Sequence, residues 1–407
     1  MKTVIIGNSA AAVGCIEGIR KTDKESEIIL IASEKHHTYS RPLISYRLLG
    51  KTDAEHMKYR PDSFYEENNV KTMLGCTAEK IDKEAHAVIL TDGTRVDYDK
   101  LLVATGSSPF IPPIDGLERA KNKFTFMSLD DSFELEKQLT NKSKVLILGA
   151  GLIGLKCAEG IKERVSQITV VDLAERVLPS ILDEDGSEMV KAHLEKQGIK
   201  FYLGNSTVSI DEKSATLKTG EKLEYDIFVI AVGVKPNTAL LKNIGGNVNR
   251  GIIVNEKCET SITDIYCAGD CSEGYDLSLG ENRVLALLPN AYMQGECAGR
   301  NIAGENVSFK NAIPMNSIGF MGLHIITAGN YTGEKTVIRT DNGYKAFFAR
   351  DNKLAGYILI GDIARAGIYT SLIRNETPLD TIDFELIKTA PQLMAFSKAS
   401  RAKMLSK

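Results

Sequence analysis

The sequence predicts an α/β fold with two similar units and a small α+β domain at the C-terminal end. Two short β-branched runs, residues 3–6 and 145–148, each lead into a turn that contains glycine. Each turn is followed by a stretch with the apolar spacing of a helix. In the last hundred residues the pattern changes to that of three strands followed by a helix.

The two turns share this strand–turn–helix context but differ in sequence. The first runs from Gly7 to Ala12 (GNSAAA) and the second from Gly149 to Gly154 (GAGLIG). A bare G-x-G-x-x-G pattern carries little weight in a chain with 34 glycines, so the context is the stronger signal. Such a turn brings backbone amides and a helix N-terminus close to the pyrophosphate of a dinucleotide. The pair therefore predicts two Rossmann-like dinucleotide-binding domains.

Each unit places an acidic residue at the end of its second strand, Glu34 in the first and Asp172 in the second. A carboxylate at this position can accept hydrogen bonds from a ribose diol. The first turn has Ser9 and Ala12 where the pattern has its second and third glycines. Alanine is tolerated at the third position because that residue serves helix–strand packing, and the Ser9 hydroxyl can bond a phosphate oxygen.

Two further apolar strands run into glycine turns and are placed to carry the chain from one unit to the other. They end at residues 104–106 (ATG) and 231–233 (AVG), and a later strand ends in Gly269-Asp270. The predicted domains are a first, discontinuous domain of residues 1–109 and 235–309, a second of residues 110–234, and a C-terminal α+β domain of residues 310–407.

The C-terminal domain is expected to contain strands over residues 336–339, 344–350 and 353–360. Asp341-Asn342-Gly343 and Asp351-Asn352 would join them, and Asn-Gly is a strong hairpin signal. A helical pattern follows through Arg374.

The composition is that of an ordinary globular protein, with 43% hydrophobic residues, 25% charged residues and a net charge of −3. Nothing in it favours nucleic acid or a membrane surface as a partner. No apolar run approaches the roughly 20 residues that span a bilayer. The chain opens directly with a strand, so we expect no signal peptide and a cytoplasmic location. We also expect a monomer or homodimer.

The seven cysteines include no C-x-x-C pair. A disulfide framework, an iron–sulfur cluster and any other metal site are therefore not predicted. Cys267 and Cys271 flank the Ala-Gly-Asp turn and are interpreted as packed residues, as are Cys15 and Cys157, which occupy equivalent places in the two predicted helices.

Taken in order, these motifs resemble the FAD- and NAD(P)H-dependent oxidoreductases of the pyridine nucleotide–disulfide oxidoreductase superfamily. The resemblance covers nearly the whole chain and implies FAD in the first domain and NADH in the second. Within the superfamily the chain is most similar to NADH:rubredoxin and ferredoxin reductases and to the flavin domain of assimilatory nitrite reductase. Residues 39–45 (YSRPLIS) and 358–362 (ILIGD) carry that likeness.

The resemblance implies the cofactor contacts residue by residue. For FAD they are Gly7, Ser9, Ala10, Ala11, Ala12, Glu34, Lys35, Arg41, Pro42, Ala78, Ala104, Thr105, Gly106, Gly269, Asp270, Asn290 and Ala291. For NAD they are Gly149, Gly151, Leu152, Ile153, Gly154, Asp172 and Gly233. Asn290 and Ala291 open a helix whose N-terminus can stabilise negative charge on a flavin. Asp172 favours NADH over NADPH because a carboxylate repels a 2′-phosphate, although nearby Arg176 would weaken that preference.

Residues 36–60 contain no cysteine, whereas members that reduce disulfides or peroxides carry their redox cysteine there. Electrons are therefore expected to pass from NADH through FAD to an external carrier such as rubredoxin, ferredoxin or an iron–sulfur subunit. Three alternatives stay open: a diaphorase component of a larger redox complex, an NADH oxidase or quinone reductase, and an NADH-responsive redox sensor.

Two positions depart from the ferredoxin reductases. Tyr46 stands where they usually have lysine, and Lys156 stands where they usually have glutamate. One hypothesis is that Lys156 supplies positive charge near the flavin and that Tyr46 holds it; compensated structural drift is the alternative. His36 and His37 are interpreted as solvated loop residues rather than catalytic ones.

The tail from residue 386 to the C-terminus has no acidic residue. Its basic residues are Lys388, Lys398, Arg401, Lys403 and Lys407. Such a face would steer an acidic carrier protein. The alternative is an amphipathic helix that packs through Leu393 and Phe396.

Overall fold

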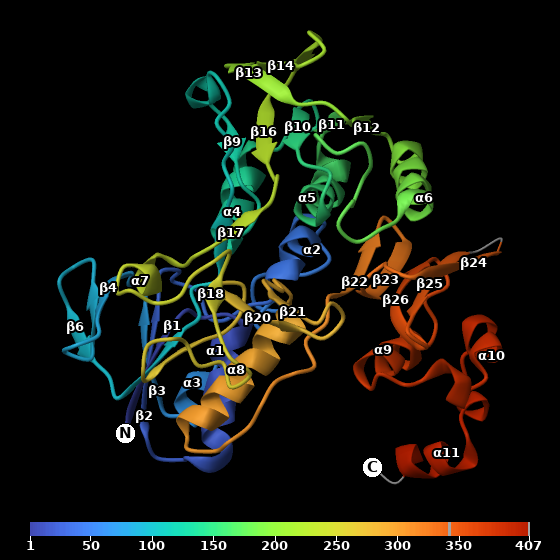
Figure 1. The fold of residues 1–407 in the computed structure, drawn as a ribbon. Helices are drawn as coiled ribbons and strands as arrows, with labels where there is room; N and C mark the ends of the chain where they lie inside the picture. Colours follow the sequence, from blue (N-terminus) through green and yellow to red (C-terminus); the bar gives the residue numbers. More distant parts are fainter. Residues whose placement is uncertain (341–342, 406–407) are drawn as a thin grey trace.

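The computed structural model describes residues 1–340 and 343–405, and it divides into two parallel-sheet units and a C-terminal sheet with helices (Figure 1). This arrangement confirms the predicted α/β class with two Rossmann-like units and a small C-terminal α+β domain. We call these the first unit, the second unit and the C-terminal part.

The first unit is built on a five-stranded parallel sheet in the order β19-β7-β1-β2-β3. Its strands are β1 (Lys2–Ile6), β2 (Glu27–Ala32), β3 (Val70–Leu74), β7 (Lys100–Val103) and β19 (Ile265–Cys267). Four of the five residues of β1 are buried, as expected for a strand covered on both faces. One face is covered by α1 (Ala10–Thr22) and α8 (Leu288–Ile302), and the other by the antiparallel strands β4 (Ala78–Asp82), β5 (Ala87–Leu90) and β6 (Arg95–Asp97).

Helices α1 and α8 cross at unusually close range because glycines line their contact. A Cβ atom on Gly14 would lie 2.2 Å from the Tyr292 carbonyl oxygen, and one on Gly295 would lie 2.0 Å from the Ala11 carbonyl oxygen. No larger residue fits at either position without moving a backbone. This contact sets the N-terminus of α8 beside the first glycine turn.

The second unit repeats the plan with the sheet order β12-β11-β10-β16-β9. Its strands are β9 (Lys123–Phe124), β10 (Lys144–Leu148), β11 (Gln167–Val171), β12 (Ile199–Tyr202) and β16 (Ile227–Ile230), and its helices are α4 (Leu129–Gln138), α5 (Leu152–Ile161) and α6 (Glu184–Lys196). An antiparallel sheet of β13 (Thr207–Asp211), β14 (Ser214–Leu217) and β15 (Lys222–Glu224) covers its outer end.

The two chain crossings between the units pair with each other. They are β8 (Ser107–Pro109) and β17 (Val234–Pro236), which run antiparallel. The remaining short elements are α2 (Ile44–Leu48), α3 (Phe64–Glu67), α7 (Ala239–Lys242), β18 (Ile252–Ile253), β20 (Ser272–Asp276) and β21 (Glu281–Arg283).

The C-terminal part contains a five-stranded antiparallel sheet, two strands more than predicted. Its elements are β22 (Met315–Phe320), β23 (Leu323–Gly329), β24 (Glu334–Thr340), β25 (Gly343–Arg350), β26 (Lys353–Ile360), α9 (Ala366–Arg374), α10 (Phe384–Thr389) and α11 (Lys398–Leu405). The three expected strands and the helix are confirmed, and Asp351 and Asn352 form the second turn with positive φ angles. Asp341 and Asn342, in the first expected turn, lie outside the described residues.

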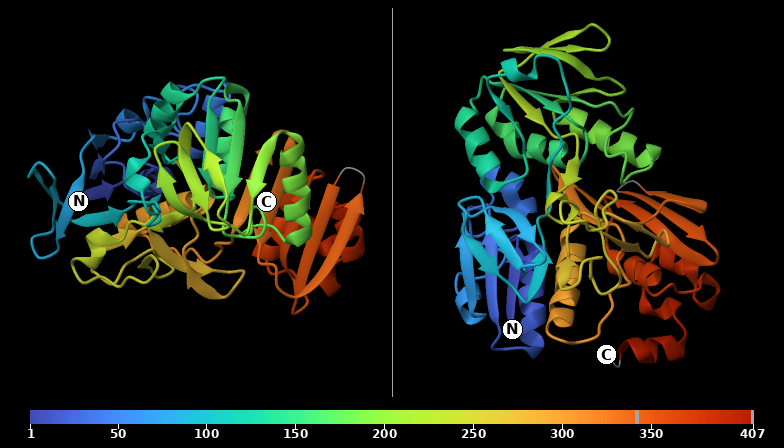
Figure 2. Two further views of the ribbon diagram at one scale, coloured as in Figure 1. Left: turned by 90° about the horizontal axis from the view of Figure 1, so that it is seen from above. Right: turned by 60° about the vertical axis from the view of Figure 1, so that its left-hand side comes forward.

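The C-terminal sheet packs its two faces against different partners. Side chains on one face, including Phe320, Ile325 and Ile360, join the hydrophobic core of the second unit, and the other face packs on α9 and α10. Figure 2 shows this sheet (orange to red) beside α6 (green). The second unit and the C-terminal part therefore share one continuous core.

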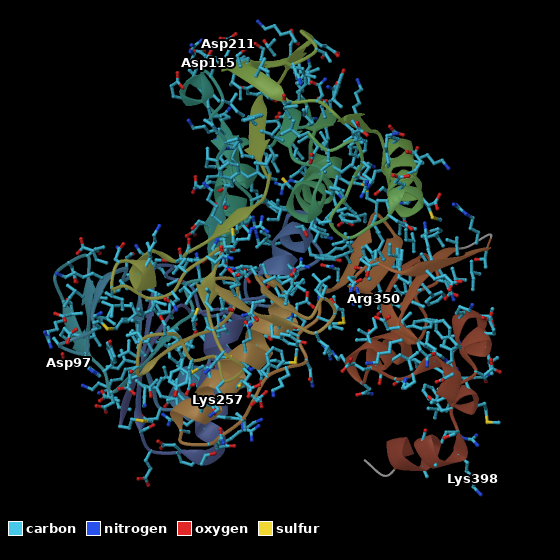
Figure 3. All side chains as sticks on the ribbon, viewed as in Figure 1. Asp97, Asp115, Asp211, Lys257, Arg350 and Lys398 are labelled. Carbon is cyan, nitrogen blue, oxygen red and sulfur yellow. The ribbon has the colours of Figure 1, made fainter. Side chains whose placement is uncertain are left out.

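The tail does not form a single helix that packs through Leu393 and Phe396. Phe396 is buried, but Leu393 is 44% exposed in a 3₁₀ turn, and α11 starts only at Lys398. Lys388 pairs with Glu385 and is buried. Figure 3 places Lys398 at the end of the molecule opposite Asp211 of the second unit. The side chain of Lys403, and Lys407, lie outside the described residues.

Candidate functional site

The two glycine turns have the same backbone geometry. Gly7 and Gly149 have φ angles of +124° and +117°. A Cβ atom on Gly7 would lie 2.0 Å from the Ala104 carbonyl oxygen, and one on Gly149 would lie 2.2 Å from the Ala231 carbonyl oxygen. Each turn therefore lies directly against the residue that follows a neighbouring strand, Ala104 after β7 or Ala231 after β16, and only glycine fits there.

The second position of each turn is open to a ligand. Gly151 has a φ of −82°, which any residue adopts, and a Cβ atom there would meet no protein atom within 4 Å. Its counterpart Ser9 is the N-cap of α1, but its hydroxyl does not cap the helix. The space beside Gly151 and the uncommitted Ser9 hydroxyl fit a pyrophosphate at each helix N-terminus.

The third position differs between the turns for a packing reason. A Cβ atom on Gly154 would lie 2.0 Å from the Gly149 carbonyl oxygen, whereas Ala12 is buried with its methyl group accommodated. Ala10 and Ala11, and likewise Leu152 and Ile153, form the first turns of α1 and α5.

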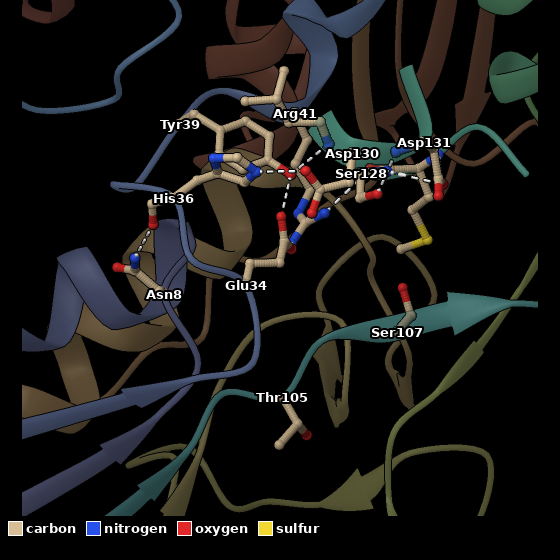
Figure 4. A network of polar contacts seen from close by, with 12 residues as sticks. Asn8, Glu34, His36, Tyr39, Arg41, Thr105, Ser107, Ser128, Asp130 and Asp131 are labelled. Atoms are coloured by element: carbon tan, nitrogen blue, oxygen red, sulfur yellow. Dashed lines mark hydrogen bonds and ion pairs between the residues drawn. The ribbon is translucent and has the colours of Figure 1, made fainter. Parts of the chain in front are cut away.

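Glu34, the predicted ribose acceptor of the first unit, lies in a polar network that reaches the second unit (Figure 4). The Tyr39 hydroxyl donates to its carboxylate at 2.6 Å, and Arg41 forms an ion pair with it. Arg41 also donates to the Met127 carbonyl at 3.1 Å, and the Leu129 amide donates to the Tyr39 oxygen at 3.0 Å. Burial raises the pKa of Tyr39, which keeps the phenol protonated as a donor.

The other predicted contacts of this segment lie around the network. Pro42 belongs to a 3₁₀ turn (Arg41–Leu43), Ala78 opens β4, and the Lys35 side chain lies against Gly75. The His36 ring contacts the Asp130 carboxylate at 2.7 Å, as Figure 4 shows.

Asn237, which was not predicted from the sequence, joins the two chain crossings by hydrogen bonds to Thr105. Its amide donates to the Thr105 carbonyl at 2.8 Å, and the Thr105 hydroxyl donates to the Asn237 carbonyl at 2.8 Å. Gly106 and Gly233 both have positive φ angles and open space where a Cβ atom would stand.

Asp270 lies at the end of β19 and is largely enclosed. The Ser107 hydroxyl donates to its carboxylate at 3.0 Å. Burial raises the pKa of Asp270 above the ordinary range, with Ser107 and Arg41 opposing the shift. The neighbouring Gly269 amide donates to the Gln294 side chain of α8 at 2.9 Å, so α8 anchors this turn. Neither Ser107 nor Gln294 was predicted, because both contacts join distant parts of the sequence.

At the start of α8 the two predicted residues have different surroundings. Ala291 is buried, and the buried Asn290 amide donates to the Ile313 carbonyl at 3.0 Å. This hydrogen bond links the start of α8 to the segment that leads into the C-terminal part.

The Asp172 side chain is hydrogen-bonded to the second glycine turn. Its carboxylate accepts from the Ala150 amide at 2.6 Å and from the Ala174 amide at 2.7 Å. The next residue, Leu173, is 75% exposed. Arg176 donates to the Pro179 carbonyl at 3.4 Å, and among the described ion pairs it has no partner.

Lys156 and Tyr46 are in contact, as the hypothesis for this pair requires. The Lys156 ammonium lies 4.3 Å from the centre of the Tyr46 ring and forms an ion pair with Glu159. Tyr46 is carried by α2, which packs against α5: a Cβ atom on Gly160 would lie 3.0 Å from the Ser45 carbonyl oxygen. Glu159 was not predicted, although its i,i+3 spacing from Lys156 was available in the sequence.

The cysteines behave as packed residues. All except Cys76 are buried, and burial raises the pKa of Cys15 and Cys157. The Cys267 and Cys271 sulfurs lie 3.5 Å apart inside the core. Within residues 1–340 and 343–405 no group of three His, Cys, Asp or Glu side chains is placed to hold a metal. Each helix in the same residues is too short or too polar to span a bilayer.

Two family models match the chain. Residues 1–295 match the pyridine nucleotide-disulphide oxidoreductase model, and residues 314–377 match the rubredoxin NAD+ reductase C-terminal domain. The solved NADH:rubredoxin oxidoreductase from Clostridium acetobutylicum is 28% identical, with a TM-score of 0.76 over 92% of this chain and 95% of that one.

Curated relatives include proteins of different length. The epsilon subunit of NADH-dependent phenylglyoxylate dehydrogenase from Aromatoleum evansii is 30% identical over 93% of this chain and 92% of its own. The nitrite reductase [NAD(P)H] from Bacillus subtilis is 33% identical over 92% of this chain but only 47% of its own length. The family match implies binding of a flavin and NAD(H). With two glycine turns of one geometry and matches along most of its length, the chain belongs to the pyridine nucleotide-disulphide oxidoreductase family.

Proposed function

We propose that this chain is an FAD-dependent NADH oxidoreductase that passes electrons to a small external redox protein, such as rubredoxin, ferredoxin or an iron–sulfur subunit. The observation that carries the proposal is the pair of glycine turns together with the lack of a cysteine in the segment where disulfide-reducing members of the superfamily carry one. Residues 36–60 have no cysteine, and six of the seven cysteines are buried. The one cysteine that is not buried, Cys76, lies outside that segment, so we infer that electrons leave for a partner that docks from outside.

The proposed domains follow the predicted boundaries. Residues 1–109 and 235–309 would bind FAD, residues 110–234 would bind NADH, and residues 310–407 would complete the site. The pairing of β8 with β17 supports this division because both crossings lie at its borders.

FAD, when bound, accepts two electrons from NADH and releases them one at a time to a carrier. The protein binds and orients both dinucleotides. Ser9 and the α1 N-terminus would hold the FAD pyrophosphate, Glu34 its ribose and Asp270 its ribityl chain. The N-terminus of α8 would stabilise negative charge on the flavin.

NADH is the proposed coenzyme because Asp172 lies beside the second turn with its carboxylate held by two backbone amides. A 2′-phosphate there would meet a fixed negative charge. We also propose Lys156 and Tyr46 as catalytic residues beside the flavin and nicotinamide, since the ammonium lies over the phenol ring. A cytoplasmic location remains a prediction from the sequence.

The test is an anaerobic NADH titration of the purified flavoprotein, followed by a screen of rubredoxin, a [2Fe–2S] ferredoxin, menadione and oxygen as acceptors. We expect full flavin bleaching and faster reoxidation by at least one carrier protein than by oxygen. Chemically reduced enzyme mixed with each acceptor isolates the second half of the reaction. If oxygen reoxidises the flavin faster than every carrier, the carrier proposal is wrong and NADH oxidase is favoured.

A second candidate is the diaphorase subunit of a larger complex. It is favoured by the similarity along 92% of a relative named as a dehydrogenase subunit. Purification of the native protein from its source at low salt distinguishes the two, because a diaphorase subunit would elute with further chains.

A further inference from the structure

The hairpin turn at residues 319–322, which comprises the last two residues of β22 and the two residues before β23, is held by side chains from two helices of the second unit. The Lys156 ammonium on α5 donates to the Gly319 carbonyl at 3.2 Å, and the Met321 amide donates to Glu159 at 2.7 Å. His193 on α6 lies 3.1 Å from the Phe320 carbonyl oxygen. Side chains of α5 and α6 thus bind the backbone of three consecutive residues in this turn, Gly319, Phe320 and Met321.

Lys156 is the centre of this contact. Its side chain is 16% exposed, and that of its partner Glu159 is 7% exposed. Besides the carboxylate and the Gly319 carbonyl, the ammonium faces the rings of Tyr46 and Phe320, with centroids at 4.3 and 5.7 Å. A nearly buried cation is stable only with such compensation, which here comes from all three parts of the fold. Figure 1 shows α2, α5 and β22 converging at this point.

We propose that Glu159 and the turn of residues 319–322 are positioning elements that hold the Lys156 ammonium against the Tyr46 ring. The C-terminal part then contributes to the coenzyme site. This inference rests on the proposed function, in which Lys156 and Tyr46 lie beside the flavin and nicotinamide. A lysine side chain is flexible, and a charge assists a reaction most when its position is set in advance. Glu159 and the turn supply that restraint.

The test measures flavin reduction by NADH in anaerobic stopped flow, which separates the limiting rate from the NADH dissociation constant. Lys156→Gln and Glu159→Gln should each lower the limiting rate about tenfold or more, while the dissociation constant changes less than about threefold. The pyrophosphate and ribose contacts are untouched, so binding persists. The double variant should be no slower than the slower single variant, because Glu159 acts through Lys156.

Asp185→Asn is the matched control. Asp185 pairs with Lys335 and Arg339 across the same interface but does not contact Lys156. It should retain the wild-type limiting rate even if the thermal unfolding temperature falls. Glu159→Asp, which keeps the charge, should recover most of the rate.

Three results would overturn the inference: a wild-type limiting rate in Glu159→Gln, an additive loss in the double variant, or a comparable loss in Asp185→Asn. If Glu159→Gln does not fold, Glu159→Asp must retain the rate and the paired change Lys156→Met with Glu159→Met must lose it. Replacing both members of a buried ion pair by apolar residues is generally tolerated. If NADH does not reduce the flavin of the wild-type protein, the proposed function is wrong, rather than this inference.

Discussion

Gly151→Ala separates what the second glycine turn does for folding from what it does for NADH. Alanine adopts the φ of −82° found at this N-cap, and its methyl group would meet no protein atom within 4 Å. An alanine at an N-cap in place of glycine costs about 0.5–1 kcal/mol. The smaller entropy of the unfolded chain returns about 0.4–1 kcal/mol. The free energy of unfolding should therefore change by less than about 0.5 kcal/mol.

The coenzyme, by contrast, should lose affinity. If the pyrophosphate lies against Gly151, the added methyl group overfills that contact at a cost of about 1–3 kcal/mol. This corresponds to a rise of roughly 5- to 150-fold in the NADH dissociation constant. The assay combines anaerobic NADH binding with thermal unfolding of the same preparation.

Gly154→Ala provides the contrast. Its methyl group would lie 2.0 Å from the Gly149 carbonyl oxygen, so the turn itself must move. We expect a loss of stability of about 1–3 kcal/mol together with weaker binding. An NADH dissociation constant in Gly151→Ala within twofold of wild type would refute the placement of the pyrophosphate.

Three further tests concern other parts of the molecule. Asp172→Ala should lower the NADH-to-NADPH ratio of kcat/KM by about tenfold or more, because the charge that repels a 2′-phosphate is removed; an unchanged ratio would contradict the assignment. Burial raises the pKa of Asp276, so the native state binds this proton more tightly and stability falls as pH rises from about 4. Asp276→Asn should therefore stabilise the protein at pH 8 but not at pH 4, measured by denaturant unfolding. Charge reversal at Arg401 and Lys403 should slow carrier reduction at 20 mM salt and less at 300 mM; equal rates would exclude the tail as a docking face.

The sequence predicts the repeated unit well because the determinants of that unit are local. A β-branched run, a glycine turn and a helical pattern lie within about 20 consecutive residues, and the strands and helices found there match the expected ones. The first glycine of each turn could be recognised in both units. In each unit a carbonyl oxygen just after a neighbouring strand leaves no room for a side chain at that position. Strands β22 and β23 were missed because their residues lack a turn signal as strong as Asn-Gly.

The polar contacts of the site were less predictable because they join distant segments. Tyr39 and Arg41 reach residues 127–129, and Asp270 reaches Ser107 across more than 160 positions. The sequence suggested that the Glu34 carboxylate could accept hydrogen bonds from a ribose. It did not indicate that Tyr39 and Arg41 already bind that carboxylate. A spacing rule describes one element at a time, whereas these contacts depend on how the two units are set against each other.

The two turns have glycine in common at the first position but differ at the second, and packing accounts for the shared glycine. At the first position the crossing strand excludes a side chain in both units, so the protein's own packing requires Gly7 and Gly149. At the second position no protein atom lies near a Cβ of Gly151, and the counterpart is Ser9. Packing therefore requires glycine at the first position, whereas at the second position it leaves open space beside Gly151. Under the proposed function, the Ser9 hydroxyl would face the pyrophosphate of FAD, and the open backbone at Gly151 would face the pyrophosphate of NADH.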